Sequence, residues 1–222
     1  VTQSGQVEAG GFVPSGVYDA DGANGDDFRT VGGDYYKPTD ADYEANCDEA
    51  RQLLADAGYP NGEGFPVVEY LYNTSDAHKA VAEALQFMWE EELGVKVTLN
   101  NQEWAAFLQT RKDGDYSIAR NGWIADYNDP ISFLDMWMTG GGNNDAQYAN
   151  DDYDALIKQA KTTTDNAERM DLLHQAEDKL IGEDNVLAPL YFYTQKYMLA
   201  DGIEGMYYCP LGYFFFGYTH QA

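Results

Sequence analysis

The chain has 222 residues, a hydrophobic content of 44% and a formal net charge of −25, from 13 basic and 38 acidic side chains. These values predict a folded globular protein and argue against nucleic acid or an anionic membrane surface as partners, since the average field of the chain repels both. The sequence contains no run of about 20 apolar residues that would predict a transmembrane helix. It opens without Met and without the basic and apolar regions of a signal peptide, so we expect a processed or excised piece of a longer protein.

Residues 1–39 are rich in Gly, Asp and Ser, and they predict an irregular lead-in that is ordered by packing on the rest of the chain. The acidic stretch DADGANGDD within it suggests calcium, but its oxygen ligands lack the EF-hand spacing, so we expect no metal there. Residues 40–58 predict a helix that Asp40 caps and Gly58 ends. Its expected buried residues are Leu53 and Leu54.

Strands and helices alternate between residues 66 and 124. The expected strands are residues 66–72, 95–99 and 116–124, and the expected helices are residues 77–93 and 104–111. This β-α-β-α-β order predicts an α/β fold with a mainly parallel sheet that helices flank.

The second half of the chain is expected to be helical at first and then extended. Helices are predicted over residues 131–138, 151–161 and 166–180, followed by a long β segment over residues 186–199. The buried stripe of the third helix should consist of Met170, Leu173, Ala176 and Leu180. The aromatic, glycine-rich end contains three consecutive phenylalanines, which should pack on this domain or on a partner lobe, because exposed they would form an adhesive patch.

Tryptophan, arginine and aspartate side chains gather between residues 102 and 130. In the predicted strand, Arg120 and Gly122 share one face, Trp123 lies on the other, and Asp126 follows the end. Polar groups at core positions cost free energy unless they are paired, and a glycine within a strand often marks close approach by another backbone. This stretch therefore predicts a site that holds a ligand.

Motifs for catalysis are missing from the sequence. It lacks HExxH, GxSxG, a phosphate-binding loop and GxGxxG. His78 lies in the first turn of a helix after a strand end, where ligands gather in α/β sheets, although a lone histidine is more often structural. The two cysteines, Cys47 and Cys209, could pair outside the cytoplasm, but spacing alone establishes no disulfide. We expect a binding protein without a cofactor, with a hydrolase as the less favoured alternative.

Several blocks of sequence resemble one family. The blocks YNTSD-x-HK, LGV-x-V-x-L-x-NQEW and R-x-GW-x-ADYN-x-P are similar to those of oligopeptide-binding proteins, the solute-binding subunits of ABC peptide importers. The resemblance covers most of residues 40–199 and implies the C-terminal lobe of a two-lobed receptor with a type II periplasmic-binding-protein-like fold. On this basis residues 1–39 are the lead-in, 40–200 the α/β core and 201–222 an aromatic tail.

The same resemblance implies a place and partners for the protein. It would be an extracytoplasmic receptor, either periplasmic or a cell-surface lipoprotein whose lipid anchor lies outside this segment. It would act as a monomer that binds an oligopeptide and delivers it to an ABC importer permease.

The resemblance also assigns roles to aromatic and acidic residues. Asp126 would pair with the α-amino group of the peptide, and Trp104 and Trp123 would line side-chain pockets. Ile124 replaces a cysteine that is common in this motif, so a family disulfide at that point would be absent.

The remaining implied ligand residues surround the other end of the peptide. Arg111, Arg120 and His78 would receive its carboxylate end, directly or through water, and Tyr193 would border it. Gly122 would lie where the peptide backbone adds by β-type hydrogen bonds, which give affinity without reading sequence.

Structural roles for these residues stay open at this point. Arg120 and Asp126 could form a buried ion pair, and Trp104 and Trp123 could be core residues. Arg111 could stabilise the C-terminus of its own helix, because a positive charge there interacts favourably with the helix dipole. A sugar or another solute is an alternative ligand on the same fold.

Overall fold

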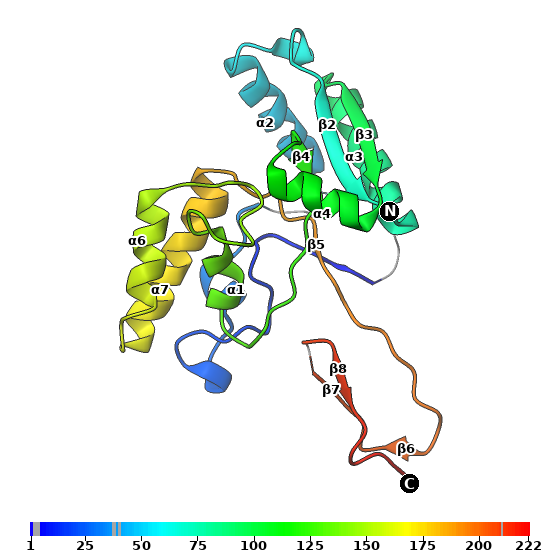
Figure 1. Ribbon diagram of the computed structural model, residues 1–222, viewed down its shortest axis with the longest axis vertical. Helices are drawn as coiled ribbons and strands as arrows, with labels where there is room; N and C mark the ends of the chain where they lie inside the picture. Colours follow the sequence, from blue (N-terminus) through cyan, green and yellow to red (C-terminus); the bar gives the residue numbers. More distant parts are fainter. Residues whose placement is uncertain (2–4, 37–38, 40, 210) are drawn as a thin grey trace.

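The computed structural model describes residues 1, 5–36, 39, 41–209 and 211–222. Along the chain they form an α/β unit, a helical unit and a C-terminal arm that projects from the body (Figure 1). Within these residues, no helix has both the length and the apolar composition needed to cross a lipid bilayer.

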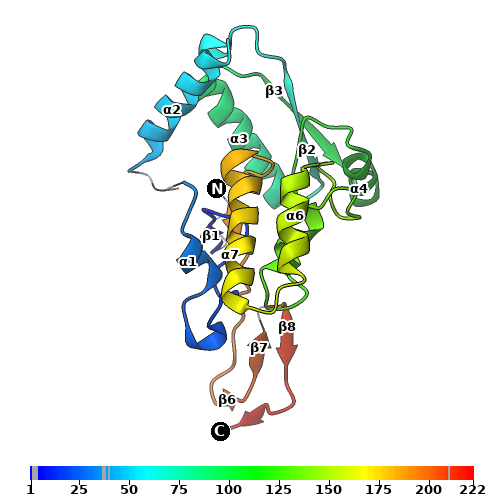
Figure 2. The ribbon, with the colours of Figure 1, turned by 90° about the vertical axis from the view of Figure 1, so that its left-hand side faces the viewer.

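A parallel three-stranded sheet forms the α/β unit. Its strands β2 (Val68–Asn73), β3 (Val97–Gln102) and β4 (Ile118–Ala119) lie in the order β3-β2-β4. The crossover from β2 to β3 and the crossover from β3 past β2 to β4 run in opposite directions across the sheet. Right-handed connections therefore place α3 (Asp76–Leu93) and α4 (Trp104–Asp113) on opposite faces. Figure 2 shows this arrangement, which confirms the predicted α/β fold with a parallel sheet.

The third strand is much shorter than predicted, so the strand predicted over residues 116–124 is wrong except at residues 118–119. Only the two residues of β4 pair with β2, and the Arg120 N–H adds one further bond to the Leu71 carbonyl at 2.8 Å. The chain then leaves the sheet, because the Gly122 N–H bonds to the Asn121 side chain at 2.8 Å instead of to a strand.

Helix α2 (Tyr43–Asp56) packs on α3, on the side away from the strands (Figure 2), and a short 3-10 turn, Pro60–Gly62, follows it. Leu54 packs against the core of this unit, but the predicted burial of Leu53 is wrong, since 63% of it is exposed. The predicted cap Asp40 lies outside the described residues. Both cysteines are free thiols.

The helical unit has the larger of the two cores. It contains α5 (Ile131–Leu134) with a 3-10 turn (Asp135–Trp137), then α6 (Asp151–Ala160) and α7 (Asn166–Glu177), which continues as a π-helical turn (Asp178–Glu183). The predicted stripe is confirmed, since each of its four residues is at most 4% exposed: Met170, Leu173, Ala176 and Leu180.

The lead-in is mostly irregular, as expected, but it contributes to that core. Its elements are β1 (Val7–Glu8), a 3-10 turn (Gly22–Asn24) and α1 (Phe28–Gly32). Val13 and Phe28 are fully buried against the helical unit. Packing therefore orders this glycine-rich stretch, as the sequence predicts.

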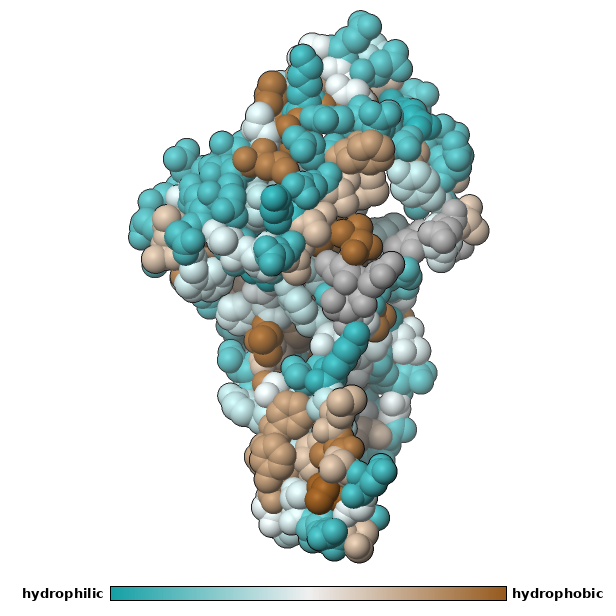
Figure 3. Space-filling view, turned by 90° about the vertical axis from the view of Figure 1, so that its right-hand side faces the viewer, coloured by the Kyte–Doolittle hydropathy of each residue, from teal (hydrophilic) through white to brown (hydrophobic). Residues whose placement is uncertain are grey.

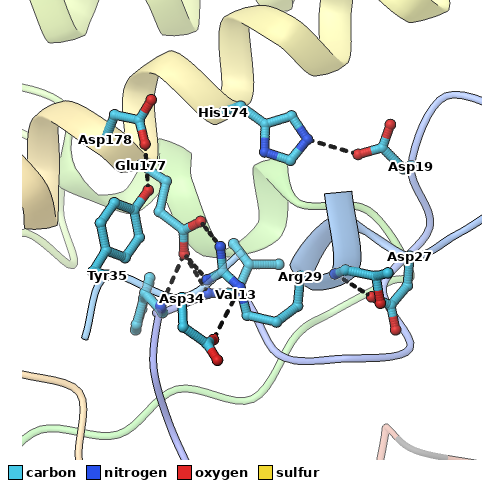
Figure 4. A network of polar contacts seen from close by, with 11 residues as sticks. Val13, Asp19, Asp27, Arg29, Asp34, Tyr35, His174, Glu177 and Asp178 are labelled. Carbon is cyan, nitrogen blue, oxygen red and sulfur yellow. Dashed lines mark hydrogen bonds and ion pairs between the residues drawn. The ribbon is translucent and has the colours of Figure 1, made fainter. Parts of the chain in front are cut away.

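A buried ion pair fastens the lead-in to α7 (Figure 4). Glu177 is 0% exposed and accepts hydrogen bonds from both terminal nitrogens of Arg29 at 2.9 and 2.8 Å. One of its oxygens also accepts the backbone N–H groups of Phe12 and Val13 at 2.8 Å. The acidic stretch is likewise tied inward, because Asp19 lies 2.8 Å from the His174 ring.

The last segment has less strand than predicted. Within residues 186–199, only β5 (Tyr191–Phe192) pairs, antiparallel to β1, so the long β segment is wrong. The arm beyond it has two small antiparallel pairs. They are β6 (Ile203–Glu204) with β9 (His220–Gln221), and β7 (Tyr207–Cys209) with β8 (Tyr213–Phe215).

Apolar and aromatic side chains gather on this arm, at the lower end of the molecule in Figure 3. Phe214 packs on Tyr208 and Tyr197 within the arm, with ring centroids 5.0 and 5.5 Å apart. Phe215 and Phe216 remain 51% and 63% exposed. Their packing on a partner lobe stays a prediction.

Candidate functional site

Three of the predicted ligand residues meet at the carboxyl ends of the central strands. Arg120 follows β4, His78 lies in the first turn of α3 after β2, and Tyr193 follows β5. The Arg120 Nη2 donates to the Tyr193 hydroxyl at 2.9 Å, and the His78 Nε2 lies 3.4 Å from the same oxygen. Tyr193 is 56% exposed, so this cluster opens to the surface.

The electrostatics of the cluster leave one fixed positive charge. Burial, and then the positive charge of Arg120, hold the pKa of His78 below its ordinary value. His78 is therefore neutral at pH 7, while Arg120 keeps its charge. One guanidinium beside a neutral imidazole and a hydroxyl is suited to bind an anionic group such as a carboxylate.

Arg111 supports the segment after β4 instead of standing free. Its Nε donates to Asp145 at 2.7 Å, and both side chains are largely buried, with 12% and 13% exposure. Its Nη1 donates to the Asn121 side chain at 2.9 Å and, at 3.4 Å, to the Arg120 carbonyl. These contacts hold the backbone that carries Arg120. The C-terminus of α4, the helix of Arg111, is capped by the backbone of Gly114.

The two tryptophans differ in what they contact. The Trp123 Nε1 donates to the Ser132 carbonyl at 2.6 Å, and the ring packs on the core of the helical unit. Trp104 is 53% exposed and stacks on Phe107, with ring centroids 5.8 Å apart. Trp123 is thus partly a core residue, and Trp104 offers an open aromatic face.

Asp126 lies on the loop that follows, and it is exposed. Its backbone N–H donates to the Ser132 hydroxyl at 2.9 Å. Within the described part of the chain, its carboxylate has no hydrogen bond or ion pair, so the buried pair with Arg120 that the sequence left open is not formed. Burial, and then the charges of Asp135, Asp129 and Asp126, raise the pKa of Tyr127.

Residues 120–126 alternate between the core and the surface. Trp123 and Ala125 pack on the core, whereas Gly122, Ile124 and Asp126 are exposed. A Cβ atom on Gly122 would lie 2.9 Å from the Arg120 Nη2, so glycine leaves the space that this guanidinium occupies. For residues 123–125, among those described, no backbone hydrogen bond is formed, which leaves an edge that an extended chain can pair with.

Sequence reasoning missed the residues that support this segment. Ser132, Asn121, Asn128 and Asp145 hold it through side-chain or backbone bonds. They lie outside any apolar periodicity, and no spacing in the sequence pointed to them.

Charged and aromatic groups that lie open at strand ends are typical of a site that binds a small solute. The chain belongs to the bacterial extracellular solute-binding proteins, family 5, whose middle-region model matches residues 2–145. This membership agrees with the expectation of a binding protein instead of an enzyme.

Individual relatives are named for peptides. The chain is 38% identical over 214 residues to the dipeptide-binding protein DppE of Bacillus subtilis, which covers 96% of this chain and 37% of that protein. It is similar in structure to Listeria monocytogenes OppA bound to peptide, with a TM-score of 0.75 and 26% identity over 99% of this chain and 40% of that one. Haemophilus influenzae OppA in complex with RPPGFSPFR gives a TM-score of 0.71 at 30% identity, covering 91% of this chain and 37% of that chain.

The chain thus spans about two fifths or less of the length of these relatives.

Proposed function

We propose that this chain forms the C-terminal lobe of a longer extracytoplasmic receptor that captures oligopeptides for an ABC importer. Asp126 pairs with the peptide α-amino group, and Arg120, with His78 and Tyr193, receives the α-carboxylate. The observation that carries the proposal is the exposed Asp126 carboxylate, which has no basic partner among the described residues. The peptide-binding names of the relatives support the same ligand class.

The order of these groups along the chain gives the bound peptide a direction. Arg120 precedes Asp126 by six residues, so a peptide with its carboxylate at Arg120 and its amine at Asp126 runs antiparallel to residues 120–126. Six extended residues span at most about 20 Å, so both ends can be held at once only in peptides of about six residues or fewer. Backbone pairing along residues 123–125 would add affinity that is independent of the peptide sequence.

In the proposed site, Arg111 and Trp123 mainly support the segment that binds the peptide. Arg111 fixes the Arg120 backbone, and Trp123 fixes the segment to the core. Trp104 offers its exposed face to a peptide side chain. Closure of a second lobe over the peptide, followed by docking on the permease, would complete the transport step.

Calorimetry on the complete receptor tests the role of Asp126. Asp126→Ala should weaken binding of tetra-alanine by at least about 2 kcal/mol, as loss of a charged partner in a closed site does. Asp171→Asn removes a charge from the exposed side of α7 and serves as the control, with unchanged affinity expected. An unchanged affinity for Asp126→Ala would remove this residue from the site.

Mass spectrometry of ligand that co-purifies with the complete receptor tests the ligand class. Intact peptides support the proposal. A sugar or another solute would keep the receptor function and replace the ligand, while peptide fragments produced from an added pool would indicate a hydrolase.

A further inference from the structure

We infer that Asn128 is a positioning residue, which holds the loop of Asp126 in place through the backbone of the lead-in. This inference rests on the proposed role of Asp126. The Asn128 side chain accepts the Tyr18 N–H at 2.8 Å and donates to the Gly16 carbonyl at 3.0 Å. One amide thereby bonds both a donor and an acceptor of a segment more than 100 residues away in sequence.

The loop needs such a support because Asp126 has none of its own. Its carboxylate has no hydrogen bond or ion pair within the described part of the chain, so its place depends on how firmly the backbone of the loop is held. The Asp126 N–H is fixed by the Ser132 hydroxyl at 2.9 Å. Toward the C-terminus, the next residue whose side chain bonds to a distant segment is Asn128, two residues on.

Gly16, whose carbonyl accepts the Asn128 bond, is itself held by further contacts. The Gly16 N–H donates to Asp27 at 2.7 Å, and the other oxygen of Asp27 accepts the Thr30 N–H at 2.8 Å and so caps α1. Burial opposes ionisation of Asp27, but these backbone bonds outweigh it and hold its pKa below the ordinary value. Gly16 has φ of +87°, which other residues rarely adopt, and Val17 beside it is buried in the core.

A second contact fixes the far side of the loop. Asp129 accepts both terminal nitrogens of Arg169 in α7 at 2.9 and 2.8 Å, and also accepts the Ile131 N–H at 3.0 Å. Asp129 is therefore occupied, and Asp126 is the carboxylate of this loop that stays available. Asn128 lies between the two aspartates and separates the fixed part of the loop from the binding part.

The affinity depends on the free-energy difference between the free and the bound receptor. A loop that becomes ordered only on binding lowers the affinity, and a loop that Asn128 already holds in place avoids this cost. The positioning role therefore predicts a change in one ratio, the affinity for a peptide with a free α-amino group divided by the affinity for the same peptide acetylated at that group. This ratio should fall when the Asn128 side chain is removed. General destabilisation would instead lower the affinity for both peptides alike.

The test compares tetra-alanine with N-acetyl-tetra-alanine on the complete receptor by calorimetry. In Asn128→Ala, we expect affinity for the free peptide to fall about tenfold, the value of one to two lost hydrogen bonds, and affinity for the acetylated peptide to fall less than about twofold. Asn166→Ala is the matched control, because the exposed Asn166 side chain of α7 donates to the Ala20 carbonyl of the same lead-in at 2.5 Å and, within the described residues, makes no hydrogen bond to the loop. Its ratio of affinities should equal that of the wild type.

A second variant keeps the test independent of folding. Gly16→Ala leaves Asn128 intact but strains its acceptor, so it should lower the same ratio while the thermal midpoint of the receptor shifts by only a few degrees. The inference is overturned if Asn128→Ala keeps the wild-type ratio or lowers both affinities equally. Equal affinity of the wild type for the two peptides would overturn the role of Asp126 itself, and the positioning role with it.

Discussion

Removing the Glu177 carboxylate should destabilise the protein more than any single change at the surface. In the substitution Glu177→Ala, the Arg29 guanidinium, which is 6% exposed, loses two hydrogen bonds, and the backbone N–H groups of Phe12 and Val13 lose their acceptor. Breaking one side of a buried ion pair costs about 3–5 kcal/mol, because the remaining charge stays desolvated. Typical domains have a total stability of about 5–15 kcal/mol, so the loss is a large part of the whole.

Equilibrium urea unfolding, followed by far-UV circular dichroism, measures this loss. Glu83→Ala is the control, since Glu83 pairs with Lys79 at 3.7 Å while both side chains are more than half exposed, and its cost should stay below about 0.5 kcal/mol. If Glu177→Ala cost no more than Glu83→Ala, the lead-in would not be held by this pair, and the argument from burial would be refuted.

Three further predictions concern the site. Because the pKa of His78 lies below its ordinary value, a carboxylate bound beside it should raise that pKa, so peptide binding at about pH 6 should take up protons. Calorimetry in buffers of different ionisation enthalpy measures the uptake, and His78→Gln should abolish it. Trp123→Phe should lower the free energy of unfolding by about 1–2 kcal/mol through its lost hydrogen bond, whereas Trp104→Phe should change it by less than about 0.5 kcal/mol; equal costs would contradict the assignment. Arg111→Met should cost about 3 kcal/mol in urea unfolding, because it leaves the largely buried Asp145 without its partner, and a cost near zero would show that this pair is not structural.

The sequence predicted the α/β unit well because its signals are local. Ser75 before α3, Gly94 in the left-handed conformation after it, and the apolar run of β2 all lie within a few residues of the elements they define. The buried stripe of α7 was also predictable from local sequence, because apolar residues that recur with a period of 3.6 residues indicate one buried helix face.

The lengths of β4 and β5 could not be obtained in this way. Tyr, Phe and Ile have high strand propensity, but whether they pair depends on a neighbouring strand. After Ala119 the Asn121 side chain competes for the backbone, and after Phe192 the strand β1 ends, so both segments leave their sheets.

The ligand residues were named from the family resemblance, and their role stays a prediction. The structure brings His78, Arg120 and Tyr193 together, and the residues that support the site come from distant parts of the sequence. Arg29 meets Glu177 across 148 residues, and Asn128 meets Gly16 across 112. A composition rich in glycine and aspartate gives no sign of which residue such a loop will contact.

The large negative charge of the chain does not decide how a peptide lies in the site. At physiological ionic strength, exposed charges are screened beyond about 8 Å, so most of the 38 acidic side chains act on solubility and not on the bound ligand. Near the site, two opposite charges lie at the ends of one short segment. The Arg120 guanidinium donates to Tyr193 at its start, and at its end the Asp126 carboxylate has no partner among the residues that the structure describes. In the proposed function, a peptide complements these charges because it carries an amine and a carboxylate at opposite ends whatever its side chains are. A reversed peptide would set like charges against each other at both ends, so the proposed site would select peptide direction by local charge without reading the peptide sequence.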